Sequence, residues 1–306
     1  EERNLTGFAY TDISTGEFKV GEIAEGATSH HVQNELLRLA PAECLLAEYD
    51  SFTREWLDKP EGGMVISPID ERALNLKTAL GILTEHFGVA SLEGFGLKEY
   101  TAGVQAAAAI ILFLQETQKG ILKHLRSLSV FNNDAFLELD YTTRRNLELS
   151  SSLREGRREG SLLGILDQCC TAMGKRNLKR WIEQPLKNIV EINNRLDAVE
   201  ELKENLALRS EIREILNGVY DLERLAAKIG GEIANPRDLL ALKYSITALT
   251  KSKEALQQAG SQLLSYLAGM DDLQDVYGII EESIDEEAPP GIREGNIIKD
   301  GFHPEI

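Results

Sequence analysis

The stretch that decides the fold is ELDYTTRRNLELSSSLREGRREGSLLGILDQCCTAMGKRNLKRWIEQPL, residues 138–186. Its parts come in an unusual order: an acidic start, a TRRNLEL helix, a basic loop flanked by glycines, and a TAMGKRNLKRW helix that runs into Pro185. Because proline cannot continue a helix, the second helix is expected to end just before it. The stretch therefore predicts a helical region with a flexible connection inside it.

Capping and spacing signals predict how these two helices are built. Asp140, or a threonine after it, is placed to accept hydrogen bonds from the first backbone N–H groups, and Leu147 is expected to supply a buried contact. Leu178, Trp181 and Ile182 recur at i, i+3 and i+4, so they are expected to form one buried face.

Almost all of the chain from residue 137 onward shows helical periodicity. Apolar residues recur at spacings of three and four in a long amphipathic stripe, formed by Ile192, Leu196, Val199, Leu202 and Leu206. Asn235 as N-cap, Pro236 at the first helical position and Asp238 in the first turn signal another helix. Capping and breaking residues interrupt the stripes about every twenty residues, which favours a packed helical domain over a coiled coil.

The N-terminal part alternates between β-prone and helical patterns. Residues 5–12 and 17–23 flank a turn signal and predict a hairpin. Helices are expected over residues 28–39, 71–87 and 101–119, and strands over residues 43–47 and 64–66. The mixture predicts a small sheet covered by helices. We expect an α/β domain over residues 1–120, a linker over 121–136 and an all-helical domain over 137–306.

Composition and charge limit the possible functions. We find no secretory signal and no uncharged apolar run long enough to cross a bilayer, so no membrane partner is expected. Cys44, Cys169 and Cys170 include an adjacent pair without zinc-like spacing, which favours a reducing cytoplasm. The 33 Lys and Arg face 50 Asp and Glu, a net charge of -17, so the chain alone is not expected to bind DNA strongly. Because it begins with Glu1 rather than Met, we expect a piece of a longer or processed chain.

Further short blocks flank the opening stretch in a fixed order. They are TDISTGEF at 11–18, GFG at 94–96, RLDAV at 195–199, DLERL at 221–225, PRDL at 236–239 and GNIIKDGF at 295–302. Together with the blocks at 140–149, 161–163 and 171–181, they resemble the MutS family of DNA mismatch repair proteins over nearly the whole chain.

The resemblance implies a connector domain of ribonuclease-H-like α/β fold, then an all-helical core, or lever, domain that ends at the entry to a clamp domain. It implies a homodimeric parent ATPase that uses ATP and Mg, recognises mismatched double-stranded DNA, becomes a sliding clamp and recruits MutL. The family's Phe-x-Glu mismatch wedge would precede this chain, and its clamp and ATPase domains would follow Ile306. We therefore expect a segment that couples those parts mechanically, with no catalytic, cofactor-binding or metal-binding residues of its own.

A metal-dependent nuclease is a competing interpretation from a different functional class. Asp12, Glu48 and Asp50 follow expected strands, and carboxylates at strand ends are what two-metal phosphodiester cleavage needs. We interpret them as loop acids of an acidic protein, since analogy of fold is weak evidence of function. A MutS-like paralogue acting in recombination and a free-standing helical interaction scaffold also remain open.

Several basic residues have both a functional and a structural interpretation. Arg154 and the GRREG loop at 156–160 are able to touch phosphates, but the glycines more simply mark a flexible connection. Arg144 and Arg145 either transmit conformational changes between domains or act as surface or packing charges. The GKR triplet at 174–176 lacks the leading glycine and the hydroxyl of a phosphate-binding loop, so we reject that role.

Two pairs of adjacent residues are not expected to form sites. His30 and His31 would point in different directions on a helix and cannot bind one metal together. Cys169 and Cys170 are expected to be inert thiols.

Overall fold

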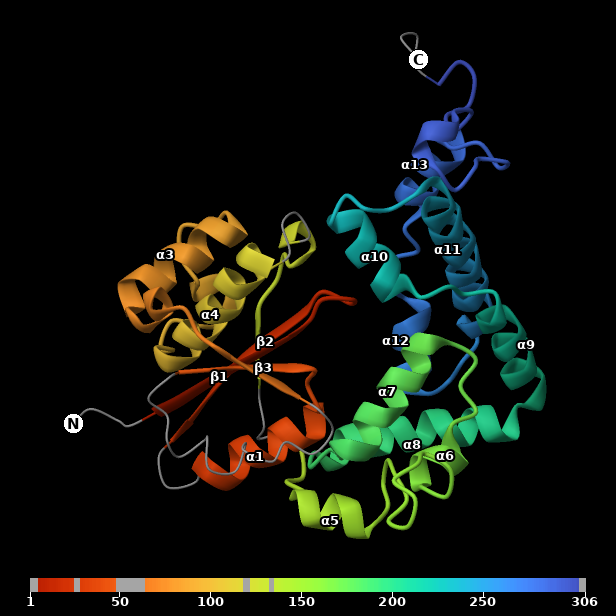
Figure 1. Ribbon diagram of the computed structural model, residues 1–306. Coiled ribbons are helices and arrows are strands. Elements are labelled where there is room, and N and C mark those ends of the chain that lie inside the picture. Colours follow the sequence, from red (N-terminus) through yellow and green to blue (C-terminus); the bar gives the residue numbers. More distant parts are fainter. Residues whose placement is uncertain (1–4, 25–27, 48–63, 118–121, 132–134, 303–306) are drawn as a thin grey trace. The chain divides into compact units, whose positions relative to one another are not determined.

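The computed structural model describes residues 5–24, 28–47, 64–117, 122–131 and 135–302 (Figure 1). The backbone contacts divide the chain into two compact units. The first unit comprises Glu1–Asp134 with Glu138–Leu147, and the second comprises Ala135–Leu137 with Glu148–Ile306. The first is α/β and the second is helical, which confirms the expected fold class.

The first unit contains a three-stranded sheet. β1 (Leu5–Asp12) and β2 (Glu17–Ala24) pair antiparallel as the predicted hairpin. β5 (Ser129–Val130) pairs parallel with the other edge of β2, with Lys19 opposite Ser129 and Val20 opposite Val130. β3 (Glu43–Leu46) and β4 (Val65–Pro68) form a separate parallel pair.

The helices of the first unit are α1 (Thr28–Leu39), η1 (Glu71–Leu74), α3 (Leu76–Phe87), η2 (Glu93–Phe95), α4 (Ala102–Thr117), η3 (Leu122–His124) and α5 (Tyr141–Asn146). α4 packs on β1 and β2 with α3 beside it, and α1 lies on the other side of these strands (Figure 1). The helix expected over 71–87 is interrupted at Asn75, whose extended backbone ends η1 and whose side chain accepts a hydrogen bond from the Thr78 backbone to start α3.

Glycine allows α4 to approach the hairpin closely. A Cβ on Gly7 would lie 2.0 Å from the backbone carbonyl carbon of Ala102. The Glu22 carboxylate accepts hydrogen bonds from the backbone nitrogens of Thr101 (2.6 Å) and Gly103 (2.9 Å), so a strand side chain caps the first turn of α4. As expected, α4 is buried on most sides.

The second unit is a helical assembly. Its elements are α6 (Leu162–Leu166), α7 (Ala172–Glu183), α8 (Ile189–Glu204), α9 (Leu206–Asn217), α10 (Leu222–Gly230), α11 (Pro236–Leu256), α12 (Gln262–Ala268), α13 (Gln274–Ser283) and η4 (Ile292–Glu294). α11 is the centre of the unit, since it contacts α9, α10, α12 and α13. With 21 residues it is about 32 Å long.

The predicted caps are confirmed. The Asp140 carboxylate accepts a 2.6 Å hydrogen bond from the Thr143 backbone at the start of α5. Asn235 and Asp238 form a reciprocal capping box at the start of α11. α7 ends at Glu183, shortly before Pro185, as expected.

Two packing predictions are wrong. Leu147 is 58% exposed rather than buried, because α5 ends at Asn146 and Glu148 turns the chain with a φ of 48°. Three residues of the predicted amphipathic stripe are more than half exposed: Leu196, Val199 and Leu206. α8 instead packs on its neighbours through a narrower face, and only Ala198 of that helix is fully buried.

Candidate functional site

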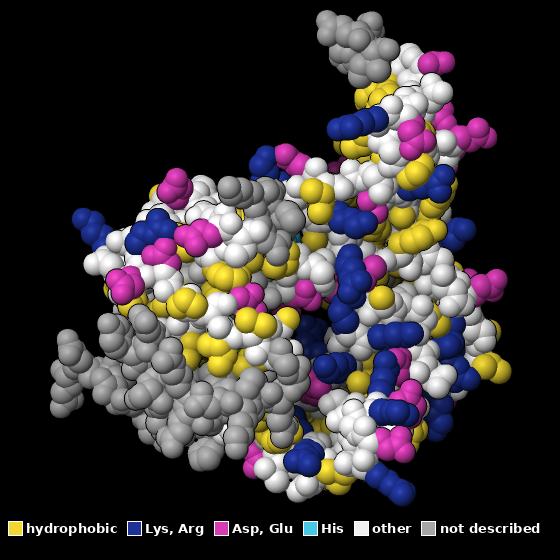
Figure 2. Space-filling model, viewed as in Figure 1, with side chains coloured by type: hydrophobic (Ala, Val, Ile, Leu, Met, Phe, Trp, Pro, Cys, Tyr) yellow, Lys and Arg dark blue, Asp and Glu magenta, His cyan; other side chains and the backbone are white. Residues whose placement is uncertain are grey.

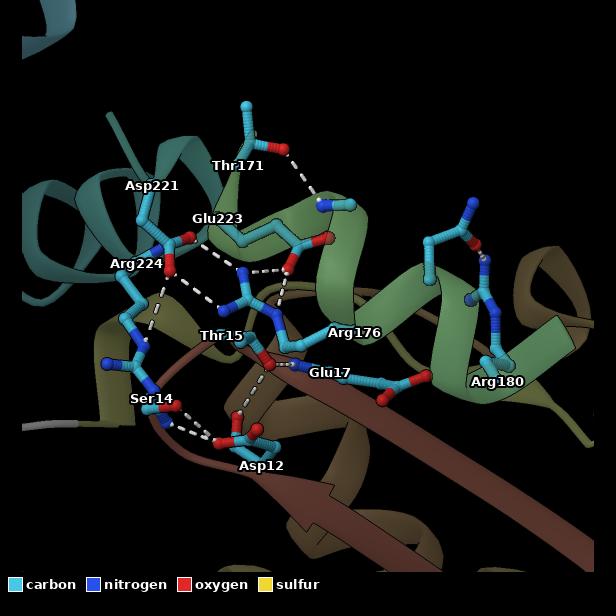
Figure 3. Close-up of polar contacts among 12 residues, drawn as sticks. Asp12, Ser14, Thr15, Glu17, Thr171, Arg176, Arg180, Asp221, Glu223 and Arg224 are labelled. Atoms are coloured by element: carbon cyan, nitrogen blue, oxygen red, sulfur yellow. Dashed lines mark hydrogen bonds and ion pairs between the residues drawn. The ribbon is translucent and has the colours of Figure 1, made fainter. Parts of the chain in front are cut away.

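The helices of the second unit are joined by a small number of charged and aromatic junctions. At the first, Arg176 on α7 reaches Asp221 and Glu223 at the start of α10 (Figure 3). Its two terminal nitrogens donate to the Asp221 carboxylate at 2.8 and 2.6 Å, and its Nε donates to Glu223 at 2.9 Å. The planar guanidinium thus binds one carboxylate through two parallel hydrogen bonds.

This junction also fixes the start of α10. The Asp221 side chain is the N-cap of that helix and accepts from the Arg224 backbone. Hydrogen bonds from Arg176 lower the pKa of Asp221 and outweigh the opposing effect of its partial burial. Asp221 therefore stays ionised, and one carboxylate both caps α10 and holds it to α7.

A second junction joins α7 to α8. The guanidinium carbon of Arg195 lies over the Trp181 ring, 3.7 Å from the ring centre. Burial lowers the pKa of Arg195, and the nearby positive charge of Arg180 adds to that effect while Glu191 opposes it.

A third junction joins α11 to α13. The Lys243 side chain is only 4% exposed, and its ammonium donates to Glu281 at 2.8 Å and also to Glu286. Burial lowers the pKa of Lys243, but the hydrogen bonds to both glutamates outweigh burial and raise it. Buried charge is tolerated here because two carboxylates neutralise it.

Glu281 and Glu201 each hold a neighbouring segment. Lys299 donates to the backbone oxygen of Glu281 at 2.5 Å, and an isolated bridge between Ile284 and Ile298 pairs the segments on either side of η4. The Glu201 carboxylate on α8 accepts from the backbone nitrogens of Gly260 and Ser261, each at 2.8 Å, just before α12. Such contacts between elements far apart in sequence stiffen the unit. They offer no reactive group.

The candidate nuclease residues do not form a described cluster. The Asp12 carboxylate accepts from the backbone and hydroxyl of Ser14 at 2.9 and 2.7 Å, so it serves the hairpin turn (Figure 3). Glu48 and Asp50 lie outside the described residues. Among the residues that the structure describes, no group of three or more His, Cys, Asp or Glu is placed to hold a metal ion.

The basic loop is exposed throughout. Residues 153–160 all face solvent, Arg158 pairs with Asp167, and the backbone of Ser152 donates to that of Arg157. In the first unit, Arg144 donates to the backbone oxygen of Asn34 at 2.9 Å, a packing contact between α5 and α1. Arg145 is exposed.

The adjacent pairs are placed as follows. The His30 and His31 side chains lie outside what the structure describes. Cys169 and Cys170 are free thiols, and burial and the nearby Asp167 raise the pKa of Cys169, which keeps that thiol protonated and weakly nucleophilic. No helix in the described part of the chain is long and apolar enough to cross a membrane.

Sequence reasoning missed the residues that make the junctions. Arg176 and Asp221 are 45 positions apart, and no local pattern pairs them. Lys243 did carry a signal, because it lies four residues after Leu239 and three before Ile246 on the inner face of α11. A charged residue at such a position requires a buried partner.

Comparison with known proteins identifies the family. The model of MutS domain II matches residues 1–126, and that of MutS domain III matches residues 142–300. The DNA mismatch repair protein MutS of Syntrophomonas wolfei is 52% identical over 100% of this chain and 36% of its own length. The MutS proteins of Halothermothrix orenii and Lachnoclostridium phytofermentans are 42% and 41% identical over 98% of the chain. The chain spans about a third of the length of these curated relatives. It therefore belongs to the MutS family of DNA mismatch repair proteins and carries that family's domains II and III.

Proposed function

We propose that the chain is the connector and lever part of a mismatch repair protein, and that it couples an ATP-hydrolysing domain to a DNA clamp mechanically, without catalysis of its own. The parent would be a cytoplasmic homodimer that binds ATP with Mg, recognises mismatched double-stranded DNA and recruits MutL. The connector would span residues 1–120, the linker 121–136 and the lever 137–306.

The observation that carries this proposal is the bracing of α11. This helix is about 32 Å long and contacts four other helices. Lys243, buried within it, holds α13 through Glu281 and the segment after α13 through Glu286. A helix supported at several levels moves as a body, so a displacement at one end reaches the other.

The coupling is tested in the full-length protein with Lys251→Pro, since Lys251 is exposed on α11. Proline removes a helix hydrogen bond and kinks the helix. We expect ATP hydrolysis without DNA and mismatch binding without nucleotide to persist, while ATP no longer releases the protein from a mismatch. Lys251→Ala is the matched control and should behave as wild type. Retained ATP-driven release in a folded Lys251→Pro variant would contradict mechanical coupling.

The absence of activity in the segment is tested directly. Purified 1–306 should hydrolyse no ATP and bind G·T-mismatched and matched duplexes equally. Specific mismatch binding by 1–306 would contradict the proposed division of labour.

Reading the gene on both sides separates mismatch repair from a recombination paralogue and from an interaction scaffold. A Phe-x-Glu-bearing domain upstream and a G-x-x-x-x-G-K-[ST] loop downstream support mismatch repair. The loop without the wedge supports the paralogue, and the absence of both features supports the scaffold.

A further inference from the structure

α7 is a basic helix in a strongly acidic chain. It carries Lys175, Arg176, Lys179 and Arg180 against a single acid, Glu183. The whole chain has a net charge of -17. α5 and α11 also carry more basic than acidic residues, two more in each, but the excess of three on α7 is the largest among the described helices.

The four cations lie on one side of α7. They are spaced i, i+1, i+4 and i+5, which at 3.6 residues per turn confines them to an arc of about 140°. Leu178, Trp181 and Ile182 occupy the opposite arc and are partly buried. α7 therefore presents a cationic face away from its own packing face.

Arg176 alone among these cations is committed to the neighbouring helix α10, through Asp221 and Glu223. In the described part of the chain no ion pair joins Lys175 to an acid, and Lys179 reaches only Glu183, at 3.7 Å. Arg180 donates to the side-chain oxygen of Asn177 at 2.7 Å and lies apart from the Arg176 cluster (Figure 3).

The charge continues beyond α7. The Arg176 junction holds α10 beside it, where the Arg224 and Lys228 side chains are 59% and 46% exposed. Figure 2 shows Lys and Arg side chains gathered over α7 and α10. Arg224 and Lys228 each have an aspartate nearby, Asp221 at 3.6 Å and Asp238 at 2.8 Å, so the net positive charge is concentrated on α7.

We propose that Lys175, Lys179 and Arg180 form a contact surface for the phosphate backbone of double-stranded DNA. The inference rests on the proposed function, since DNA is the polyanion on which the parent would act. Lys175 and Lys179 are one helical turn apart, roughly 6 Å along the axis, which suits successive contacts to a closely charged polymer. Contacts to phosphates position a protein on a duplex without reading its sequence, so this surface would hold DNA in the same way whether or not it contains a mismatch.

The test measures binding of the 306-residue chain to a matched duplex of about 25 base pairs by fluorescence anisotropy, across a range of salt concentrations. Three phosphate contacts predict that log K falls with log salt concentration with a slope of about -3. The triple variant Lys175→Gln, Lys179→Gln, Arg180→Gln should lose most of this slope and at least tenfold in affinity at low salt. Glutamine is a good helix former, and unchanged circular dichroism will verify the fold.

The matched control removes three exposed lysines elsewhere: Lys77→Gln, Lys203→Gln, Lys251→Gln. This control variant changes the net charge by the same amount as the triple variant on α7 but leaves α7 intact. Its slope of log K against log salt concentration should therefore stay near that of wild type. No wild-type binding at low salt, or an equal loss in the control, would overturn the proposal. Polyglutamate binding as tightly as DNA would overturn it in favour of an acidic protein partner.

These outcomes are distinct from those for the proposed function. Mechanical coupling is read from ATP-driven release in the full-length protein. The cationic face is read from the salt slope of the 306-residue chain on matched DNA. Either result can fail without the other.

Discussion

The guanidinium of Arg195 on α8 covers the ring of Trp181 on α7, with 3.7 Å between the guanidinium carbon and the ring centre. Pro185 ends α7 between these two residues, so the contact fixes the angle at which the chain re-enters a helix. A cation over an indole contributes about 0.5 to 2 kcal/mol, depending on its hydration.

Arg195→Lys should weaken this contact, because an ammonium lacks the planar surface that stacks on the ring. We expect a loss of about 0.5–1.5 kcal/mol in the stability of the helical unit. Urea unfolding followed by Trp181 fluorescence in a Trp56→Phe background measures it. Arg237→Lys, at an exposed position of α11, is the control and should change stability by less than about 0.5 kcal/mol. Equal effects of the two substitutions would contradict a stabilising contact between Arg195 and Trp181.

Arg176→Met should destabilise the helical unit by about 1–3 kcal/mol, because it leaves Asp221 without its two parallel hydrogen bonds. Arg180→Met, one turn later on the same helix, should have little effect on stability, since Arg180 is exposed. The midpoints of denaturant unfolding compare the stabilities of the two variants. The double variant Arg176→Met, Asp221→Asn should be less destabilised than the sum of the single changes, and strict additivity would contradict a direct interaction.

Lys243→Met should destabilise the helical unit in a pH-dependent way. Hydrogen bonds from Lys243 lower the pKa values of Glu281 and Glu286, so the stabilisation is present above their ordinary pKa of about 4.3. It is lost as the pH falls through the lowered values, because the carboxylates then become protonated. The difference in stability between wild type and variant should therefore be largest near neutral pH and shrink below about pH 4.

Thermal unfolding between pH 7 and pH 3 tests this dependence. Lys251→Met, on an exposed part of α11, is the control and should show no such change. A stability difference for Lys243→Met that stays constant over this range would show that lost packing, rather than charge, accounts for the effect.

Gly7→Ala should destabilise the α/β unit by more than about 2 kcal/mol, because its Cβ would meet the backbone of Ala102 at 2.0 Å. Gly81 is the control. It lies in α3 with nothing within 4 Å of an added Cβ, so Gly81→Ala should stabilise by about 0.5–1 kcal/mol. Thermal unfolding of both variants tests the pair, and similar midpoints would contradict the close approach of α4 to the hairpin.

Local signals in the sequence were enough to predict most elements. The caps at Asp140 and Asn235 are read within one helical turn, and both are confirmed. Leu147 shows the limit of this reasoning, because its exposure depends on where α5 ends and on the positive φ of Glu148. Periodicity identifies an apolar face but not what covers it, as Leu196 and Val199 illustrate.

The junctions between helices required the structure. Arg176 meets Asp221 only because the tertiary fold brings the start of α10 close to α7, and neither residue carries a local sign of that pairing. The family resemblance predicted the order of the domains, and the domain matches agree with it, whereas the individual contacts depend on tertiary packing.

The parallel pairing of β5 with β2 has a consequence for synthesis on the ribosome. Val20 cannot pair with Val130 until that residue leaves the ribosome, 110 residues later. At about 5–20 residues per second, one edge of the hairpin stays unpaired for roughly 5 to 20 s. An open strand edge is prone to pair with other nascent chains during that interval. The vulnerable period therefore falls before the helical half of this chain has been made.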